Sequence, residues 1–564
     1  MKFKDFKYER PDFNQFKERV IALIQDMQDA DTASDQIDII KKIHKHHSSI
    51  STLNTISSIR HTINTKDEFY SKENGYWDEY SPLYSEIELM FQKALISSKF
   101  RVQLEAEFGI LYFKLIENSL KVFSTEIIKE CQEENKLVTE YTKLIASAEI
   151  EYKGKIYNLS GLGPFKESKD REERKESFNL YINFFKENKE KFEEIYDKLV
   201  RIRHEKAKKL GFNNYVEFGY VNMNRMDYNK EMVANFRKQV EEIIVPVARK
   251  LYEDQKERLG LDTLQYYDEV YEFTSGNAKP HGDAEFILNG GKKMYSELSP
   301  ETKEFFNFMT ENELLDLETK VGKQGGGYCT YIPEYKSPFI FSNFNGTSGD
   351  IDVLTHEAGH AFQVYSSRHI EVPELNFPTY ESCEIHSMSM EFITWPWMEL
   401  FFKEETDKYK YKHLASAMKF IPYGVTVDEF QHFVYENPQA TKEERNRYWR
   451  ELEHKYLPHK NYLDIEFLEE GCWWFRQGHI FSMPFYYIDY TLAQICALQF
   501  WKKMNYNREE GWQDYLAICK VGGTKSFLEL VKLANLISPF ENGCIASIIN
   551  EIKKYLDKID DKKL

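Results

Sequence analysis

Residues 350–360 read DIDVLTHEAGH and have the spacing of a metal site on a helix. His356 and His360 are four residues apart, so on a helix both imidazoles lie on one face and can bind the same ion. Glu357, beside the first histidine, could take a proton from a water on that ion. An incomplete version, HEKAK at 204–208, has a lysine in place of the second histidine. The pattern therefore predicts a metal-dependent hydrolase on condition that a third ligand exists.

A catalytic zinc ion generally takes three protein ligands and keeps one position for water. The stretch TYESCEIHSMSMEF offers candidates for the third ligand, namely Glu381, Glu384, His386 and Glu391. Glu384, Ser387 and Glu391 are spaced at i, i+3 and i+7, so they share one helical face that could pack against the first helix. His386 points to another side of that helix, and the spacing leaves it open as the alternative to Glu384.

A zinc-binding histidine usually donates its other N–H to a carboxylate or a carbonyl, which fixes the tautomer. Asp352 lies one helical turn before His356 and is expected to accept this hydrogen bond, with Glu391 as a further outer carboxylate. Asp352 would also suit the N-terminus of the helix as a negative charge. Gly359 costs the helix about 1 kcal/mol relative to alanine. Close packing of two backbones or room for a substrate would explain that cost.

A second group of polar side chains lies far downstream, in RQGHIFSMPFYYIDY at residues 476–490. Hydrolysis places negative charge on the attacked carbonyl oxygen, and neutral donors can share that charge with a metal. The imidazole of His479 and the phenols of Tyr486, Tyr487 and Tyr490 are such donors. The alternative is an aromatic stripe that only fills a hydrophobic core.

The chain has 564 residues, a net charge of −17 and seven cysteines without a Cys-x-x-Cys pair. The length allows two or more domains. The charge disfavours nucleic acids and anionic membranes as partners, and the cysteine pattern favours a reducing compartment. The first residues, MKFKDFKYERPDF, contain no apolar stretch typical of a secretion signal. We therefore expect a cytoplasmic protein that binds neither nucleic acid nor membrane.

Most of the chain has the composition of helices. Residues 13–135 combine Glu, Lys, Leu and Ile at helical spacing with few Gly or Pro, and residues 241–260 predict another clear helix. Residues 158–164, NLSGLGP, indicate a turn-rich break. Residues 320–349 instead contain glycines, β-branched and aromatic residues, which predict strands and tight turns. The expected fold class is mostly α, with a small β-sheet directly before the candidate metal helix.

Together these motifs resemble one known family. HEAGHAFQ, then EIHSMSME and finally GHIFSMPFYYIDY resemble the thimet oligopeptidase and oligoendopeptidase F family of zinc peptidases. MKFKDFKYERPDF and LGFNNYVEFGY are similar to its bacterial branch, which includes the Pz-peptidases that act on collagen-derived peptides. The resemblance runs along essentially the whole chain. It implies a two-lobed helical molecule with a deep central channel, and we expect an N-terminal helical lobe at 1–195 and a catalytic domain at 196–564.

The resemblance also implies roles for single residues. It favours Glu384 over His386, so that His356, His360 and Glu384 would bind one zinc ion per chain, with Glu357 as the general base. His479, Tyr487 and Tyr490 would stabilise the transition state. Peptide substrate would contact Gly326, Gly327, Tyr328 and Tyr486. The spacing between the histidine and the tyrosines differs from the thimet branch, so which of Tyr486, Tyr487 and Tyr490 contacts the oxyanion is left open.

The expected function is intracellular hydrolysis of short, unstructured oligopeptides, with collagen-derived, Pro- and Gly-containing peptides as one substrate class. Two rivals are a peptide-binding protein without catalysis and a zinc peptidase of broader specificity. The cleavage preference, the physiological peptide, the role of Cys383 and the oligomeric state, a homodimer included, are left open. Cobalt or manganese could also occupy the same ligands.

Overall fold

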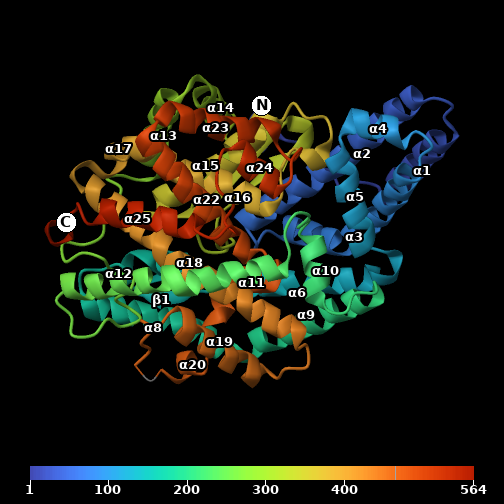
Figure 1. The fold of residues 1–564 in the computed structure, drawn as a ribbon. Helices are drawn as coiled ribbons and strands as arrows, with labels where there is room; N and C mark the ends of the chain where they lie inside the picture. The colour runs from blue at the N-terminus through green and yellow to red at the C-terminus, as the bar shows by residue number, and fades with distance from the viewer. Residues whose placement is uncertain (464) are drawn as a thin grey trace.

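The computed structural model describes residues 1–463 and 465–564, and helices make up most of it. The first five α-helices lie together at one side of the molecule (Figure 1). Three of them begin at a side chain that accepts a hydrogen bond from a backbone N–H of the first turn, namely Asp12, Thr32 and Asp67. Their apolar faces form the smaller of two hydrophobic cores. These helices are α1 (Phe13–Asp29), α2 (Ala33–Ile63), α3 (Glu68–Ile96), α4 (Arg101–Phe108) and α5 (Ile110–Val122).

The remaining helices surround the larger hydrophobic core. Before the catalytic motif they are α6 (Ile128–Ala146), α7 (Gly163–Lys166), α8 (Arg171–Glu187), α9 (Lys189–Lys209), α10 (Tyr215–Asn222), α11 (Lys230–Gln239), α12 (Val245–Arg258), α13 (Ala284–Leu298) and α14 (Pro300–Glu311). From the motif onward they are α15 (Gly349–Ser367), α16 (Tyr380–Ile393), α17 (Glu399–Phe402), α18 (Thr406–Glu436), α19 (Lys442–Tyr456), α20 (Glu466–Glu469), α21 (Gly478–Ser482), α22 (Tyr487–Tyr506), α23 (Arg508–Val521), α24 (Phe527–Leu533) and α25 (Cys544–Leu556). Within the described residues, none of the helices combines the length and apolarity needed to cross a bilayer.

A three-stranded sheet lies directly before α15, as the composition predicts. Its strands are β3 (Leu315–Glu318), β4 (Tyr328–Ile332) and β5 (Ser337–Phe344) in the order β3-β5-β4. The central strand β5 is parallel to β3 and antiparallel to β4, and it is almost entirely buried. A hairpin of β1 (Ile150–Tyr152) and β2 (Lys155–Tyr157) is an additional small sheet that the composition did not indicate.

A tight turn connects β5 to α15 and sets the direction of that helix. The carboxylate of Asp350 accepts hydrogen bonds from the backbone N–H groups of Asn345 (2.9 Å) and Gly346 (2.8 Å). An acidic side chain in the first helical turn also suits the helix dipole. The turn therefore fixes where α15 leaves the sheet, and with it the position of every side chain of the motif.

The two lobes are joined by segments that cross between the cores. Val372 and Leu375, in the loop between α15 and α16, are buried in the smaller core. Ile195, the expected last residue of the N-terminal lobe, lies inside the uninterrupted helix α9 and is buried in the larger core. The structure thus corrects the expectation of a lobe boundary between residues 195 and 196, because a continuous helix rather than a linker occupies that position.

Candidate active site

The predicted site residues meet at a cavity of about 1080 Å³ between the two lobes, which we call the interlobe cavity. One wall comes from N-terminal helices and includes Gln92, Tyr112 and Tyr141. The larger lobe contributes two more walls, one from α15 and α16, which we call the metal wall, and one from residues 476–490, which we call the donor wall. The sequence-predicted residues that line it are Gly326, Gly327, Tyr328, His356, Glu357, His360, Glu384, His479, Tyr486 and Tyr490. This arrangement confirms the expected two-lobed, mostly helical fold with a deep central channel.

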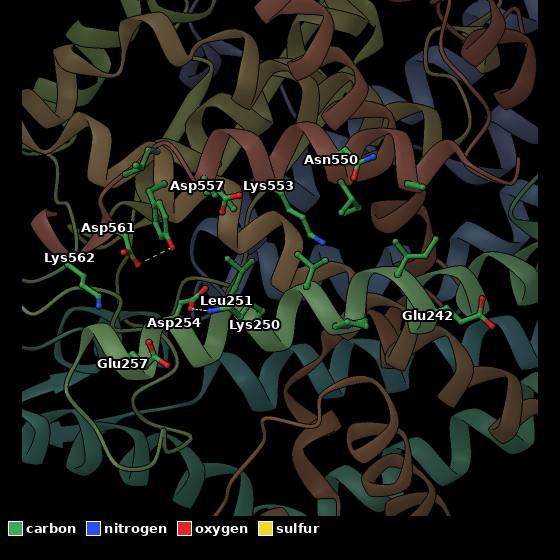
Figure 2. Close-up of a pocket in the computed structure, with 18 residues that line it drawn as sticks. Glu242, Lys250, Leu251, Asp254, Glu257, Asn550, Lys553, Asp557, Asp561 and Lys562 are labelled. Atoms are coloured by element: carbon green, nitrogen blue, oxygen red, sulfur yellow. Dashed lines mark hydrogen bonds and ion pairs between the residues drawn. The ribbon is translucent and has the colours of Figure 1, made fainter.

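A second hollow, of about 720 Å³, lies at the surface between α12 and α25 (Figure 2). Charged side chains of both signs line it, among them Lys250, Asp254 and Lys553. None of the predicted site residues reaches this groove. We therefore place the chemistry in the interlobe cavity.

Three donor side chains converge at the bottom of the interlobe cavity. One ligand atom from each of His356, His360 and Glu384 lies within 4.8 Å of the other two. Oε2 of Glu384 is 3.1 Å from Nε2 of His356 and 3.4 Å from Nε2 of His360. Donors about 2.1 Å from one ion at tetrahedral angles would lie about 3.4 Å apart. The spacing and the nitrogen and oxygen donors therefore fit a zinc ion.

The carboxylate of Glu384 is held from two further sides. Its Oε2 accepts a hydrogen bond from Oγ of Ser387 at 2.8 Å, one helical turn away. Its Oε1 accepts one from the phenol of Tyr486. With both oxygens oriented, the carboxylate needs little rearrangement to bind a metal.

Gly359 allows α15 and α16 to approach closely. A Cβ at this position would lie 2.6 Å from the backbone oxygen of His386 and 2.6 Å from Cα of Ser387. Any other residue would push the two helices apart and separate the ligands on α15 from the one on α16. His386 itself is fully buried, outside the cavity lining. Close helix packing thus explains the glycine, and Glu384 rather than His386 faces the two histidines.

A chain of hydrogen bonds extends outward from His356. Its Nδ1 lies 2.8 Å from Glu391, whose other oxygen lies 2.8 Å from Nε2 of His413. The indole of Trp395 donates to Nδ1 of His413 at 3.0 Å. Because an indole N–H can only donate, His413 must accept at Nδ1 and donate from Nε2 to Glu391. Glu391 then accepts from Nδ1–H of His356, which leaves Nε2 of His356 free to bind a metal.

Burial alone would raise the pKa of Glu391, but the hydrogen bonds from His356 and His413 lower it below its ordinary value. The carboxylate is therefore charged when it accepts both hydrogen bonds. His413 and Trp395 were missed by sequence reasoning, since neither stands at a fixed spacing from the motif.

Asp352 does not accept the hydrogen bond expected from His356, because Glu391 occupies Nδ1 of that histidine. Its carboxylate instead accepts from the phenol of Tyr409 at 2.6 Å. Helical side chains lean toward the N-terminus, so the short side chain of Asp352 is directed away from His356. The structure corrects this assignment. Asp352 does lie in the first turn of α15, where the sequence also predicts a negative charge.

Glu357 is buried beside the ligands and is free to act on a water molecule. Its Oε2 has no hydrogen-bond partner among the described residues. Burial raises the pKa of its carboxyl group, while His356 and His360 act in the opposite direction. A carboxylate in such surroundings is a stronger base than one in water.

The glycine-rich segment passes directly over Glu357. A Cβ at Gly327 would lie 3.1 Å from Oε1 of Glu357 and 3.1 Å from Cγ1 of Val353, so a larger residue would require these two side chains to shift slightly. Gly326 has a φ of +87°, which also favours glycine. Tyr328 anchors the segment, since its hydroxyl lies 2.7 Å from Oγ1 of Thr62.

A second hydrogen-bond chain orients His479. The phenol of Tyr423 donates to Oε1 of Gln477 at 2.8 Å, and the Gln477 amide nitrogen lies 2.8 Å from Nδ1 of His479. The amide nitrogen can only donate, so Nδ1 accepts and Nε2 carries the hydrogen. Burial lowers the pKa of His479 to about 4, with Glu384 acting in the opposite direction. The imidazole is therefore a neutral donor, and its Nε2 lies 3.2 Å from the hydroxyl of Tyr490.

The three tyrosines do not share one environment. Tyr486 and Tyr490 are four residues apart, so both reach the interlobe cavity from one side of α22 and the turn before it. Tyr487 points about 100° away around the helix and packs against Phe420 and Tyr423. This corrects the expectation that Tyr487 donates to the reacting oxygen. Tyr490 keeps a hydroxyl hydrogen for a substrate, whereas that of Tyr486 is used by Glu384.

Comparison with known proteins agrees with this geometry. The family model described as "Peptidase family M3" matches residues 164–548, and that of the "Peptidase M3 N-terminal domain" matches residues 3–123. The solved structure of "PZ peptidase A with inhibitor 2" has 56% sequence identity and a TM-score of 0.99 over 100% of both chains. An "Oligoendopeptidase F homolog" of Borreliella burgdorferi is 26% identical over 457 residues, which are 76% of this chain and 74% of that protein. The resemblance read from the motifs is confirmed, and this chain belongs to peptidase family M3, a family of metallopeptidases.

Proposed function

We propose that the protein is a cytoplasmic, zinc-dependent endopeptidase that hydrolyses short, unstructured peptides. The observation that carries the proposal is the convergence of three suitably spaced donors and one unpartnered glutamate inside the interlobe cavity. All seven cysteines are unpaired, which supports a reducing compartment.

His356, His360 and Glu384 would hold the zinc ion. A zinc ion there would polarise the scissile carbonyl and acidify a water molecule. Glu357 takes the proton of the attacking water and then delivers it to the leaving amine. Its unpartnered Oε2 is the atom available for this transfer.

The donor wall, formed by residues 476–490, would stabilise the negative charge that develops on the carbonyl oxygen. Tyr490 donates from its hydroxyl, and His479 keeps that hydroxyl oriented through Nε2–H. Both groups are uncharged, so they do not repel the oxyanion. This role extends the sequence expectation for His479 and Tyr490.

The peptide main chain would lie along β4 and the glycines before it. Within the described residues, β4 is an edge strand whose one partner is β5, so its outer edge can pair with an extended peptide. Gly326, Gly327 and Tyr328 line the cavity beside Glu357 and would contact such a peptide as it passes this residue. Folded proteins would not enter a cavity between two lobes. Peptides that contain Pro and Gly, such as collagen fragments, are one proposed substrate class because they remain extended.

The test is cleavage of an internally quenched peptide of about ten residues, with a chelator and with zinc added back. We expect loss of cleavage with chelator, recovery with zinc, and no digestion of folded protein. Bound zinc without cleavage of any peptide in a varied set would support a peptide-binding protein instead. Digestion of a folded protein at a similar rate would contradict the restriction to short peptides.

A further inference from the structure

Arg476 is a cation in the wall of the interlobe cavity that the proposed reaction does not use. It ends the short 3-10 helix Cys472–Arg476, three residues before His479. Its guanidinium lies 4.7 Å from the ring centroid of Trp473 and 5.2 Å from that of Tyr423. Its Nε is buried without a hydrogen-bond partner, and no carboxylate of the described chain forms an ion pair with it. The aromatic rings position the charge, but they do not neutralise it.

A second cation lies behind Arg476. Burial and the nearby Arg476 guanidinium together lower the pKa of Lys166 to about 8. The Lys166 ammonium lies 4.2 Å from the ring centroid of Tyr181, and Tyr181 lines the cavity. The adjacent Glu167 partly opposes this shift, but it forms its ion pair with Lys412 rather than with Lys166. Two like charges therefore lie close together, Arg476 in the cavity lining and Lys166 behind it, and neither forms an ion pair with a carboxylate of the described chain.

An unpaired charge in a partly buried site is costly, since the protein replaces water without supplying an opposite charge. A ligand that carries an anion would offset this cost. The acidic residues in the cavity lining are Glu357 and Glu384, which belong to the metal site, and Glu374. The anionic groups of an unmodified peptide are carboxylates, which occur at the C-terminus and on Asp and Glu side chains. The planar guanidinium can bind a carboxylate through two parallel hydrogen bonds.

We propose that Arg476, supported by Lys166, is a subsite that binds a carboxylate of the peptide substrate, with the free C-terminus as the main source. The proposal rests on the peptidase function proposed above and specifies its substrates. Arg476 is linked to the oxyanion donors through Tyr423 and Gln477. A C-terminus bound there leaves room for only a short segment between it and the cleaved bond. The subsite would thus select short peptides by their end as well as by their lack of structure.

The experiment compares peptides of one sequence that end in a free acid or in an amide, and a third that ends in an amide but has Asp as its last residue. For the natural protein we expect the amide to have a KM about tenfold higher than the acid, because it lacks one charged hydrogen-bonded pair. Arg476→Gln should remove this difference and Arg476→Lys should retain part of it. Lys525→Gln, which removes another cation of the cavity lining, should leave the difference unchanged.

Each outcome separates the subsite from the peptidase function. Equal KM values for acid and both amides with the natural protein would overturn the subsite while peptide cleavage continues. A preference for the acid that persists in Arg476→Gln, or that Lys525→Gln also abolishes, would overturn the role of Arg476. Recovery of a low KM by the Asp-containing amide supports a carboxylate site that also accepts a side chain. Absence of cleavage for all peptides would instead overturn the proposed function. The acid and amide comparison needs no variant, so it holds even if Arg476→Gln does not fold.

Discussion

The metal wall and the donor wall of the interlobe cavity differ in how they use charge. On the side of α15 and α16, the anionic residues Glu384 and Glu391 hold the histidines. On the donor wall, the two groups hydrogen-bonded to His479 are neutral, an amide at its Nδ1 and a phenol at its Nε2, although the cation Arg476 lies farther along the same segment. A cation needs anionic support, whereas an oxyanion needs donors without negative charge. One feature is common to both walls: a hydrogen-bond chain that begins outside the cavity, at Trp395 or at Tyr423, fixes the tautomer of a histidine.

Replacing the general base Glu357 should abolish most of the catalytic activity without removing the metal ion. We expect Glu357→Gln to lower kcat about 10³-fold, because the loss of a general base costs about 10²- to 10⁴-fold. Zinc content should remain near one ion per chain, since the three ligands are unchanged. Metal analysis and cleavage of a quenched peptide on the same preparation measure both quantities. Near-normal turnover of the zinc-loaded variant would remove Glu357 from this role.

Two tyrosines test the donor wall as a matched pair. Tyr490→Phe should lower kcat about 10²-fold with little change in KM, as expected for a donor that acts in the transition state. Tyr487→Phe also removes a phenol hydroxyl, but from a face of α22 that lies outside the cavity lining. It should change kcat less than about threefold. Steady-state kinetics on one peptide compare them directly. A similar loss in both variants, or a change confined to KM for Tyr490→Phe, would contradict the assignment.

The sequence predicts the metal wall better than the donor wall, and helical spacing is the reason. His356, Glu357 and His360 lie on one continuous helix, and Glu384 and Glu391 lie on another, so their relative directions follow from residue numbers. Tyr486, Tyr487 and Tyr490 surround the start of α22, and which face of that helix meets the cavity depends on packing by α18. The mainly helical fold and the small sheet were likewise predictable from composition.

The hydrogen-bond partners that site residues recruit from distant parts of the chain could not be predicted from the sequence. Trp395 follows α16 in a short 3-10 turn, and His413 lies on α18. The Trp395 indole donates a hydrogen bond to the His413 imidazole across these separate elements. The same holds for Tyr423 and Gln477, which are 54 residues apart. The error at Asp352 has a related cause, because spacing placed it near His356 whereas tertiary packing supplied Glu391. Contacts between separate elements require the packed structure.

The outer end of the metal wall offers a smaller test. Trp395→Phe removes the donor to His413, and we expect the affinity for zinc to fall about tenfold, at the lower end of the range for outer partners of zinc ligands. Trp501→Phe is the control: its indole nitrogen is buried without a partner, and its ring centroid lies 6.4 Å from that of Trp395. Competition with a chromogenic chelator measures the affinity independently of activity. Equal losses in both variants would indicate a packing effect rather than a hydrogen-bond chain.

The neutrality of His479 gives the smallest expected effect and the sharpest test of the donor wall. Its pKa of about 4 in the folded protein lies below the ordinary value of about 6.5. Between these values the unfolded chain binds a proton at this residue and the folded chain does not, so acidification from pH 6.5 toward pH 4 favours unfolding. His479→Gln should therefore lose less stability over this range than the natural protein. Thermal unfolding as a function of pH measures this difference, and nitrogen NMR of labelled histidine should report Nε2–H without titration between pH 5 and 8. A midpoint near 6.5 would mean that the His479 imidazole takes up a proton as readily as an exposed histidine. Its assignment as a buried, neutral donor beside Tyr490 would then be incorrect.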